Sequence, residues 1–300
     1  MNIIIYYFYI KRKGVFEIFP DIIKLSEKYF QITPTDISLK DTFECGQCFR
    51  WNDDGNGYIG VAYGKAVRFI QGDGCIYIKG ADVEDIENIW LKYLSLDVDY
   101  SDVVKRFDDD EYIKKASQFG KGIRILRQEP CEATISFIIS SNNNIKRIKK
   151  IIEHFCMLFG DPIEFEGKTL YTFPTNDSLK KISVEALGPI KAGFRDKYIA
   201  DAANRIVSGE IDFEKITALE TDSARKALMC IKGVGPKVAD CILLFGFERS
   251  EAFPKDVWIK RVMTEIYGDD FDETRFGKDA GIIQQWMFHY ARINSTEKSE

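Results

Sequence analysis

The feature that most constrains this chain is a glycine-rich turn between two amphipathic helical patterns. Residues 224–247 read ARKALMCIKGVGPKVADCILLFGF, and Gly233, Val234 and Gly235 lie between the two apolar stretches. The glycines permit a tight turn and close backbone approach, and Pro236 suits the first position of a helix. Free N–H groups at such a helix start can hold a phosphate without reading base sequence. The pattern predicts a helix-hairpin-helix, which by itself could be a non-catalytic clamp on a DNA backbone.

Lys237 follows directly, in the first turn of the second predicted helix. The positive end of the helix dipole disfavours a charged lysine there, and any burial acts in the same direction. We therefore expect the pKa of Lys237 to be lowered, which would make its amine a nucleophile of the Schiff-base kind. An ordinary solvated lysine also fits this position.

Asp256, in the stretch FPKDVWIKRV, precedes another predicted helix. Capping that helix is the common role of an aspartate at such a position. The helix N–H groups are also expected to keep the carboxylate ionised. It would then be suited to stabilise a cationic sugar or to help move protons.

Composition and charge limit the class of protein. The chain has 300 residues, of which 45% are hydrophobic and 30% are charged, so it can build one large or two moderate soluble domains. It has no apolar window long enough to span a membrane. The start, MNIIIYYFYIKRKG, predicts a strand rather than a signal peptide. The net charge of −5 does not indicate nucleic-acid binding, but residues 144–150 carry four basic side chains and no acidic one.

The seven cysteines are scattered and odd in number, which is typical of reduced thiols in an intracellular protein. Cys45 and Cys48 form a lone CxxC without a second pair at zinc spacing, so we expect no metal there. No cysteine follows Cys241, which excludes a four-cysteine iron–sulfur site at the C-terminus.

The chain divides into a β-rich part and a helical part. Residues 56–80 alternate apolar and polar positions, with GDG as a hairpin turn, and helical spacing starts at residue 83. Beyond residue 130 the pattern is almost wholly helical, including an apolar stripe over 145–159 closed by Gly160. The predicted fold class is α+β, with an N-terminal antiparallel β-sheet domain packed on an all-helical domain. Residues 295–300, STEKSE, are expected to form a loose tail.

Lys237, Asp256 and the hairpin together resemble the helix-hairpin-helix DNA glycosylase superfamily. Further blocks over about residues 35–292 are similar to the 8-oxoguanine DNA glycosylase family: FECGQCFRW (43–51), GIRILRQEP (122–130), SFIISSNNNIKRI (136–148), GFRDKY (193–198) and GIIQQWMFHYAR (281–292). The resemblance implies an N-terminal extension over 1–32, a sheet domain over 33–126 and a helix-hairpin-helix glycosylase domain over 127–295.

The resemblance also implies a bifunctional glycosylase/AP lyase that acts on duplex DNA containing 8-oxoguanine. The damaged base is flipped out of the stack, because its atoms cannot be reached inside it. Lys237 would attack C1′ of the sugar, expel the base and form an imine, and β-elimination would then cut the strand 3′ to the lesion. Asp256 would stabilise the developing positive charge. No metal or organic cofactor is required.

The resemblance assigns the recognition of the base to four residues. The backbone carbonyl of Gly46 would accept from N7–H, a donor that 8-oxoguanine has and guanine lacks. Cys241 and Phe288 would sandwich the base, and Gln284 would read its Watson–Crick edge. Residue types alone predict a turn glycine at 46 and core packing for Cys241 and Phe288.

The remaining implied contacts are with DNA outside the base pocket. Asn142, with Asn143 beside it, would fill the space left by the flipped base, although these asparagines could merely cap the next helix. Arg147 and Arg195 would bind the unpaired cytosine through bidentate contacts. Phe194 would insert as a wedge into the base stack.

Three positions depart from the pattern of many animal relatives. Phe194 stands where they have tyrosine, Trp258 where they have histidine, and Cys48 where they have serine. The change at Trp258 puts its expected phosphate contact in doubt, and the change at Phe194 weakens the expected preference for cytosine opposite the lesion.

Two alternatives remain open from the sequence. One is a catalytically silent helix-hairpin-helix DNA-binding protein, and the other is a glycosylase for a different damaged base, such as alkylated adenine or an oxidised pyrimidine. In each case we expect an intracellular protein that acts on DNA as a monomer, without a membrane and without an obligate protein partner.

Overall fold

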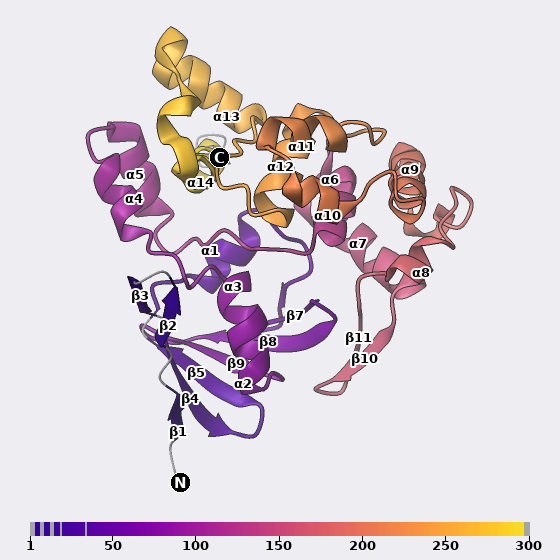
Figure 1. The fold of residues 1–300 in the computed structure, drawn as a ribbon, viewed down its shortest axis with the longest axis horizontal. Helices are drawn as coiled ribbons and strands as arrows, with labels where there is room; N and C mark the ends of the chain where they lie inside the picture. The colour runs from indigo at the N-terminus through magenta and orange to yellow at the C-terminus, as the bar shows by residue number, and fades with distance from the viewer. Residues whose placement is uncertain (1–3, 7–8, 13–14, 19, 34, 297–300) are drawn as a thin grey trace.

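An antiparallel sheet forms the N-terminal part of the molecule (Figure 1). The computed structural model describes residues 4–6, 9–12, 15–18, 20–33 and 35–296, and within these the sheet has seven strands. Their spatial order is β1 (Ile4–Tyr6), β4 (Asp21–Ser26), β5 (Tyr29–Thr33), β9 (Ile76–Lys79), β8 (Lys65–Gln71), β7 (Tyr58–Ala62) and β6 (Asn52–Asp53). A separate hairpin pairs β2 (Tyr9–Arg12) with β3 (Val15–Ile18). The N-terminal strand and the turn between β8 and β9 are confirmed.

The sheet begins before residue 33. The sequence analysis had assigned residues 1–32 to an extension that precedes the sheet domain. Strand β5 pairs with β9 in the register Phe30↔Ile78, and β4 pairs with β5 in the register Ile22↔Ile32. Ile22 and Ile32 are fully buried in the sheet core. These two strands are therefore built into the sheet, with alternate side chains directed into its core.

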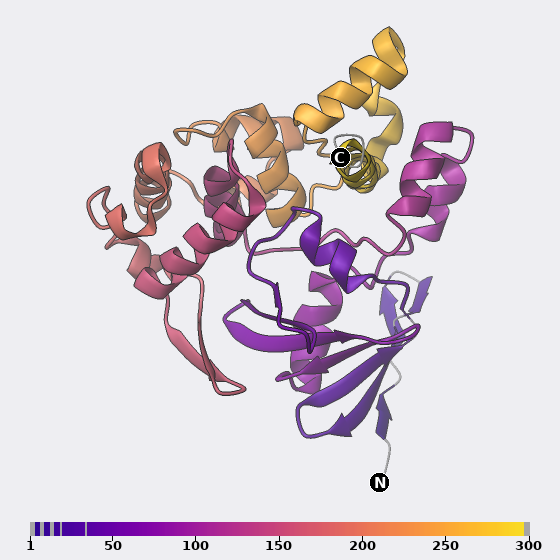
Figure 2. The same ribbon diagram turned by 180° about the vertical axis from the view of Figure 1, so that it is seen from behind.

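A helix lies across the sheet and supplies the centre of its aromatic core (Figure 2). It consists of α2 (Val83–Asp85), a π-helical turn η1 (Ile86–Trp90) and α3 (Leu91–Tyr93), in the place where helical spacing was predicted. Trp90 is fully buried and packs edge-on against Phe69 of β8, with 5.5 Å between the ring centroids. A short helix, α1 (Leu39–Glu44), adds Phe43, which stacks on Trp51 at 4.8 Å.

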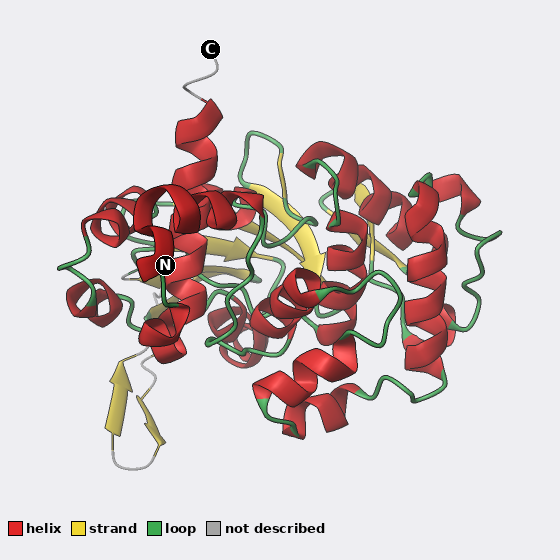
Figure 3. Ribbon diagram, turned by 90° about the horizontal axis from the view of Figure 1, so that it is seen from above, coloured by secondary structure: helices red, strands yellow, loops and turns green. Residues whose placement is uncertain are grey.

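Helices make up most of the remaining chain and cover the sheet when the molecule is viewed from above (Figure 3). The α-helices are α4 (Ser101–Arg106), α5 (Glu111–Phe119), α6 (Pro130–Ser140), α7 (Ile145–Phe159), α8 (Asn176–Leu179), α9 (Asp196–Val207), α10 (Phe213–Ala218), α11 (Thr221–Leu228), α12 (Pro236–Gly246), α13 (Val257–Val262) and α14 (Ala280–Thr296). Shorter turns are η2 (Gly188–Ile190), η3 (Gly193–Arg195), η4 (Met263–Tyr267), η5 (Gly268–Asp270) and η6 (Glu273–Asp279). Helix α7 ends at Gly160 as predicted. None of the described helices is long and apolar enough to cross a membrane.

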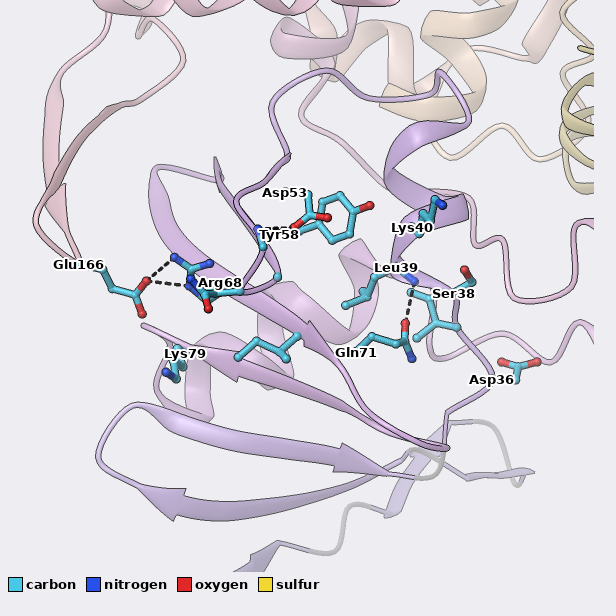
Figure 4. A pocket seen from close by; sticks show the side chains of 15 residues that line it. Asp36, Ser38, Leu39, Lys40, Asp53, Tyr58, Arg68, Gln71, Lys79 and Glu166 are labelled. Carbon is cyan, nitrogen blue, oxygen red and sulfur yellow. Dashed lines mark hydrogen bonds and ion pairs between the residues drawn. The ribbon is translucent and has the colours of Figure 1, made fainter. Parts of the chain in front are cut away.

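The helical part contains a β-hairpin that the sequence analysis did not predict. It pairs β10 (Pro162–Phe165) with β11 (Lys168–Tyr171) through a two-residue turn. Both turn residues, Glu166 and Gly167, have positive φ, which is the geometry of a type I′ turn. Arg68 of β8 donates to Glu166 and so ties the hairpin to the sheet (Figure 4). The alternation is only four residues long on each side, too short to stand out beside the helical pattern of α7.

The helical core is centred on α6, which is buried on nearly all sides. Phe137 of α6 stacks on Phe245 of α12 with 5.3 Å between ring centroids. The C-terminal helix α14 packs on α5 through Tyr290, whose ring lies 5.5 Å from that of Tyr112. Of the predicted tail, Ser295 and Thr296 continue α14, and 297–300 lie outside the described residues.

The loop after α1 joins the sheet to the helices. Gln47 is fully buried; its amide nitrogen donates to the carbonyl of Arg124, and its amide oxygen accepts from the N–H of Leu126. Next to it, Arg50 forms a buried ion pair with Glu132 of α6 at 3.0 Å. Breaking a buried pair leaves an uncompensated charge, so this loop is firmly held. It thereby places Gly46 at the junction of the two parts.

Candidate active site

The predicted helix-hairpin-helix is formed by α11, a tight turn and α12. Gly233 has φ +83°, and a Cβ there would lie 2.4 Å from the ring of Tyr198, so only glycine fits. Val234 is buried and anchors the turn, while Gly235 is the N-cap of α12, which begins at Pro236. The first N–H groups of α12 have no partner within the helix, as at any helix start. The local geometry is that of an anion-binding turn.

Lys237 projects from this first turn towards the core. Its Nζ lies 5.9 Å from the centroid of the Phe137 ring, and it contacts Cys241 one turn further along α12. The predicted lowering of its pKa was wrong for the free protein. The charge that Cys241 carries when ionised, together with the Asp256 carboxylate, raises the pKa of Lys237 although burial opposes this. Burial in turn raises the pKa of the Cys241 thiol.

Asp256 caps α13, as its position predicted. One carboxylate oxygen accepts from the N–H of Trp258 at 3.0 Å and from the N–H of Ile259 at 2.9 Å. Burial raises the pKa of Asp256, and the two N–H groups, Lys237 and Arg292 only partly offset this. The two hydrogen bonds of the cap fix the carboxylate, and the cations Lys237 and Arg292 lie close to it.

Lys237 and Asp256 open onto one cavity of roughly 570 Å³ at the junction of the sheet and the helices. Its wall takes side chains from the Gly46 loop, the α6–α7 connection, the starts of α12 and α13, and the second half of α14. Of the predicted residues, the lining includes Gly46, Asn142, Asn143, Lys237, Asp256, Trp258 and Phe288. A cavity of this volume fits one small ligand group.

The four residues expected to recognise the base divide between the cavity lining and the layer beneath it. Gly46 has φ +92°, and a Cβ there would lie 3.7 Å from Phe288 and 3.5 Å from Arg292. Cys241 and Gln284 are buried behind the lining. The amide nitrogen of Gln284 donates to the carbonyl of Pro254 at 3.1 Å, while its amide oxygen has no partner among the described residues. That oxygen is available for a donor on a ligand.

The three consecutive asparagines have different roles. Asn142 is exposed and has φ +48°, a left-handed conformation that asparagine tolerates. The side chain of Asn143 donates to the carbonyl of Ile139 at 3.1 Å. Asn144 caps α7 by accepting from the N–H of Arg147 at 2.9 Å. The capping alternative therefore holds for Asn144, which leaves Asn142 free of that role.

The two arginines predicted to bind an unpaired cytosine differ in their surroundings. Arg195 is buried, and its guanidinium donates to the carbonyls of Ser141 at 2.9 Å and Asn142 at 2.7 Å. It therefore holds the asparagine loop in this structure. Arg147 is exposed, and its guanidinium donates to the carbonyl of Lys191 at 3.3 Å. Neither arginine lines the cavity.

Phe194 and Trp258 lie at the surface next to the site. Phe194 is 56% exposed, in keeping with a side chain that could enter a base stack. Trp258 is half-buried at the edge of the cavity, and Arg261 lies over its ring at 5.1 Å.

The CxxC cysteines are not part of the site, because Cys45 and Cys48 are buried in the core. Among the residues that the structure describes, no cluster of histidine, cysteine, aspartate or glutamate could hold a metal ion.

Arg292 lines the cavity and was not singled out from the sequence. It lies one helical turn after Phe288, and its guanidinium carbon is 5.3 Å from the centroid of that ring. It also donates to the carbonyl of Glu44 at 3.1 Å. Its spacing from Gln284 and Phe288 along a single helix face was the signal that could have identified it.

Comparison with known proteins agrees with this arrangement. The family described as 8-oxoguanine DNA glycosylase, N-terminal domain, matches residues 29–134, and the HhH-GPD superfamily base excision DNA repair protein matches residues 135–276. A probable N-glycosylase/DNA lyase of Methanothermobacter thermautotrophicus is 33% identical over 215 residues, which cover 62% of this chain and 69% of that protein. The N-glycosylase/DNA lyase of Saccharomyces cerevisiae is 32% identical over 267 residues, which cover 79% of this chain and 70% of that protein.

Solved structures of DNA glycosylases are also similar to this chain. The Clostridium acetobutylicum 8-oxoguanine glycosylase/lyase in complex with double-stranded DNA containing cytosine opposite 8-oxoG is 38% identical, with a TM-score of 0.87; the match covers 92% of this chain and 99% of that one. The 3-methyladenine DNA glycosylase of Archaeoglobus fulgidus shares the fold at 20% identity and a TM-score of 0.70, over 88% of this chain and 99% of that one. The chain belongs to the 8-oxoguanine DNA glycosylase family, within the helix-hairpin-helix superfamily of base-excision repair proteins.

Proposed function

We propose that this protein excises 8-oxoguanine from duplex DNA and then cuts the strand 3′ to the resulting site. The observation that carries the proposal is that one cavity joins Lys237 and Asp256 with Gly46 and Phe288. The first two supply a nucleophile and a carboxylate, and the second two supply a backbone face and an aromatic face for a flat base. A DNA clamp needs neither Lys237 nor Asp256, which counts against a catalytically silent protein.

The chemistry follows from the placement of the two charged groups. Lys237 reacts as a free amine, so its ammonium must first lose a proton. Its nitrogen then forms a bond to C1′ as the C1′–N9 bond breaks, and the base leaves with the electron pair. Asp256 stabilises the positive charge that develops on the sugar. The adduct opens to an imine, loss of a proton from C2′ breaks the C3′–O bond, and the expelled base can carry that proton.

Lesion identity is read by contacts that guanine cannot make. The carbonyl of Gly46 accepts from N7–H of the lesion, whereas guanine would present a second acceptor there. Phe288 and Cys241 enclose the two faces of the base. The unpaired amide oxygen of Gln284 accepts from the N1–H and N2–H groups of its Watson–Crick edge.

Contacts at the rim of the cavity and beyond it hold the duplex. The turn formed by Gly233, Val234 and Gly235 binds a backbone phosphate, and Trp258 lies where a second backbone contact is expected. Asn142 fills the gap left by the flipped base, Asn143 fixes the loop behind it, and Phe194 wedges into the stack. Arg147 favours cytosine opposite the lesion, with Arg195 shaping the loop. The protein acts as a monomer and needs no metal.

Borohydride trapping on duplex DNA with 8-oxoguanine opposite cytosine tests the proposal. The wild type should form a covalent adduct, and Lys237→Gln should form none and lose base excision by at least roughly 10³-fold, because the nucleophile is absent. Lys232→Gln is the matched control, since this exposed lysine lies in the same hairpin but outside the cavity. A wild type that binds the duplex but forms no adduct would contradict the lyase chemistry.

A further inference from the structure

Three residues of α14 form a stripe along the helix face next to the cavity. Gln284, Phe288 and Arg292 are spaced four residues apart, so each lies about one turn, or roughly 6 Å, beyond the previous one. Phe288 is in the middle and lines the cavity together with Arg292. A base lying flat on Phe288 therefore has Gln284 towards one edge and Arg292 towards the opposite edge.

The guanidinium of Arg292 is fixed beside the Gly46 backbone. It donates to the carbonyl of Glu44 at 3.1 Å, and its Nη1 lies 3.5 Å from the point where a Gly46 Cβ would be. It also borders the Phe288 ring, at 5.3 Å from the centroid. The acidic groups near it include Asp256 and Glu44, which favour its charged form although burial lowers the pKa of Arg292. A cation is thus held next to the carbonyl proposed to bind N7–H.

The lesion presents two acceptors beside N7–H, namely O6 on the Watson–Crick side and O8 on the five-membered ring. With Gln284 at the Watson–Crick edge and Gly46 at N7–H, O6 points back towards Gln284. O8 is on the other side of N7, in the direction of Arg292. A charged donor placed there matches the one oxygen that distinguishes the lesion from guanine.

We propose that Arg292 donates a hydrogen bond to O8 of the flipped base, which makes it a specificity-determining residue for this reaction. The inference rests on the proposed function, and in particular on the orientation set by Gly46 and Gln284. Guanine carries C8–H at that position, which gives the guanidinium no acceptor. Negative charge that spreads onto O8 as the base leaves is stabilised by the same contact.

A substitution of one atom in the substrate tests this contact. 8-Thioguanine keeps N7–H and the Watson–Crick edge but replaces O8 with sulfur, a weak acceptor. Single-turnover base excision is measured with 8-oxoguanine and with 8-thioguanine, each opposite cytosine, for the wild type and for Arg292→Met. Methionine keeps most of the side-chain length and removes the charged donors. Cleavage of a preformed abasic site is recorded alongside, as a readout that involves no base.

The quantity that decides the test is the ratio of the two excision rates within each protein. In the wild type 8-oxoguanine should be excised roughly tenfold faster than 8-thioguanine, because a charge-assisted hydrogen bond is expected to contribute a factor of about this size. In Arg292→Met this preference for 8-oxoguanine should largely disappear. Arg292→Lys should retain part of it. Abasic-site cleavage by Arg292→Met should fall far less than excision of 8-oxoguanine.

Two other results would overturn the inference, and a third would point elsewhere. If Arg292→Met excised both lesions more slowly by the same factor, so that the ratio of the two rates was unchanged, Arg292 would only position the Gly46 loop. Undiminished excision of 8-oxoguanine by that variant would mean that Arg292 has no part in recognition. A wild type that cleaves abasic sites but does not excise 8-oxoguanine would contradict the proposed function itself.

Discussion

The two sides of the cavity are assembled from the chain in different ways. Lys237 and Asp256 lie 19 residues apart, at the starts of the neighbouring helices α12 and α13. Gly46 and Phe288, which form the wall proposed to recognise the base, come from the loop after α1 and from the C-terminal helix, 242 residues apart. The proposed reactive groups therefore depend on local structure, whereas the proposed recognition wall depends on the docking of the sheet onto the helices. The following predictions test whether reaction and recognition can be separated.

The largest effect after loss of Lys237 should come from Asp256→Asn. Asparagine caps helices as well as aspartate does, so α13 should remain intact. Base excision should fall by roughly 10²–10⁴-fold, because the charge that stabilises the cationic sugar is lost. Single-turnover excision and thermal unfolding are measured together. A large drop in thermal stability would show that the carboxylate charge supports the fold instead.

The two arginines near the asparagine loop should affect different properties. Arg195→Ala removes a buried donor from the carbonyls of Ser141 and Asn142, and should lower the free energy of unfolding by roughly 2–3 kcal/mol. Arg147→Ala removes an exposed side chain and should leave stability nearly unchanged, but reduce the preference for cytosine opposite the lesion. Urea unfolding and excision opposite cytosine and adenine measure the two effects. Equal stability of the two variants would contradict this assignment.

Gly46→Ala should damage recognition more than stability. Position 46 has φ +92°, so alanine is strained there by about 1 kcal/mol, and its methyl group would project between Phe288 and Arg292. Binding of 8-oxoguanine DNA should weaken by roughly tenfold relative to abasic DNA. Gly55→Ala is the control, because Gly55 has φ +86° with no atom within 4 Å of an added Cβ. The two variants should have similar stability, and only the first should lose discrimination.

The charge environment of Lys237 should appear in the pH dependence of excision. The neighbouring Cys241 and Asp256 raise the pKa of Lys237, so at neutral pH most of its amine is protonated and unreactive. The single-turnover rate should therefore increase from neutral to alkaline pH. The effect of Cys241 is the larger one once its thiol ionises at alkaline pH, so Cys241→Ala should lower the pKa of Lys237 in that range and shift the rise to lower pH. Cys156→Ala, another buried thiol, should leave the profile in place. A flat wild-type profile would contradict the assignment.

The sequence predicted the reactive side of the site better than its electrostatics. The hairpin, the start of α12 at Pro236 and the Asp256 cap follow from local signals, namely glycine, proline and a capping carboxylate at helix boundaries. The directions in which the pKa values of Lys237 and Asp256 shift could not be predicted from the sequence. They depend on burial and on the approach of Cys241 to Lys237, which arise only when the helices pack.

The residues proposed to recognise the base could be identified only through the resemblance to the family. Gly46 resembles any turn glycine, and Gln284 any polar residue of a helix, until the fold brings α14 against the loop after α1. Arg292 could have been found only through its four-residue spacing from Phe288, once the resemblance had assigned Phe288 to the base pocket. The β10–β11 hairpin was missed because its strands are short and are held by tertiary ion pairs such as that of Arg68 with Glu166.

The smallest effect concerns Phe194, which belongs to neither wall. Its ring is 56% exposed and lies edge-on to Tyr198 at 5.8 Å, so it contributes little to the core. Phe194→Ala should slow excision by roughly tenfold, since stacking on a base contributes about 1–3 kcal/mol, whereas Phe194→Tyr should stay within about twofold because the ring is kept. Val184→Ala, at an exposed apolar position outside the cavity, is the control. If Phe194→Ala excised the lesion at the wild-type rate, base flipping would not depend on a wedge, and the cavity walls alone would hold the base out of the stack.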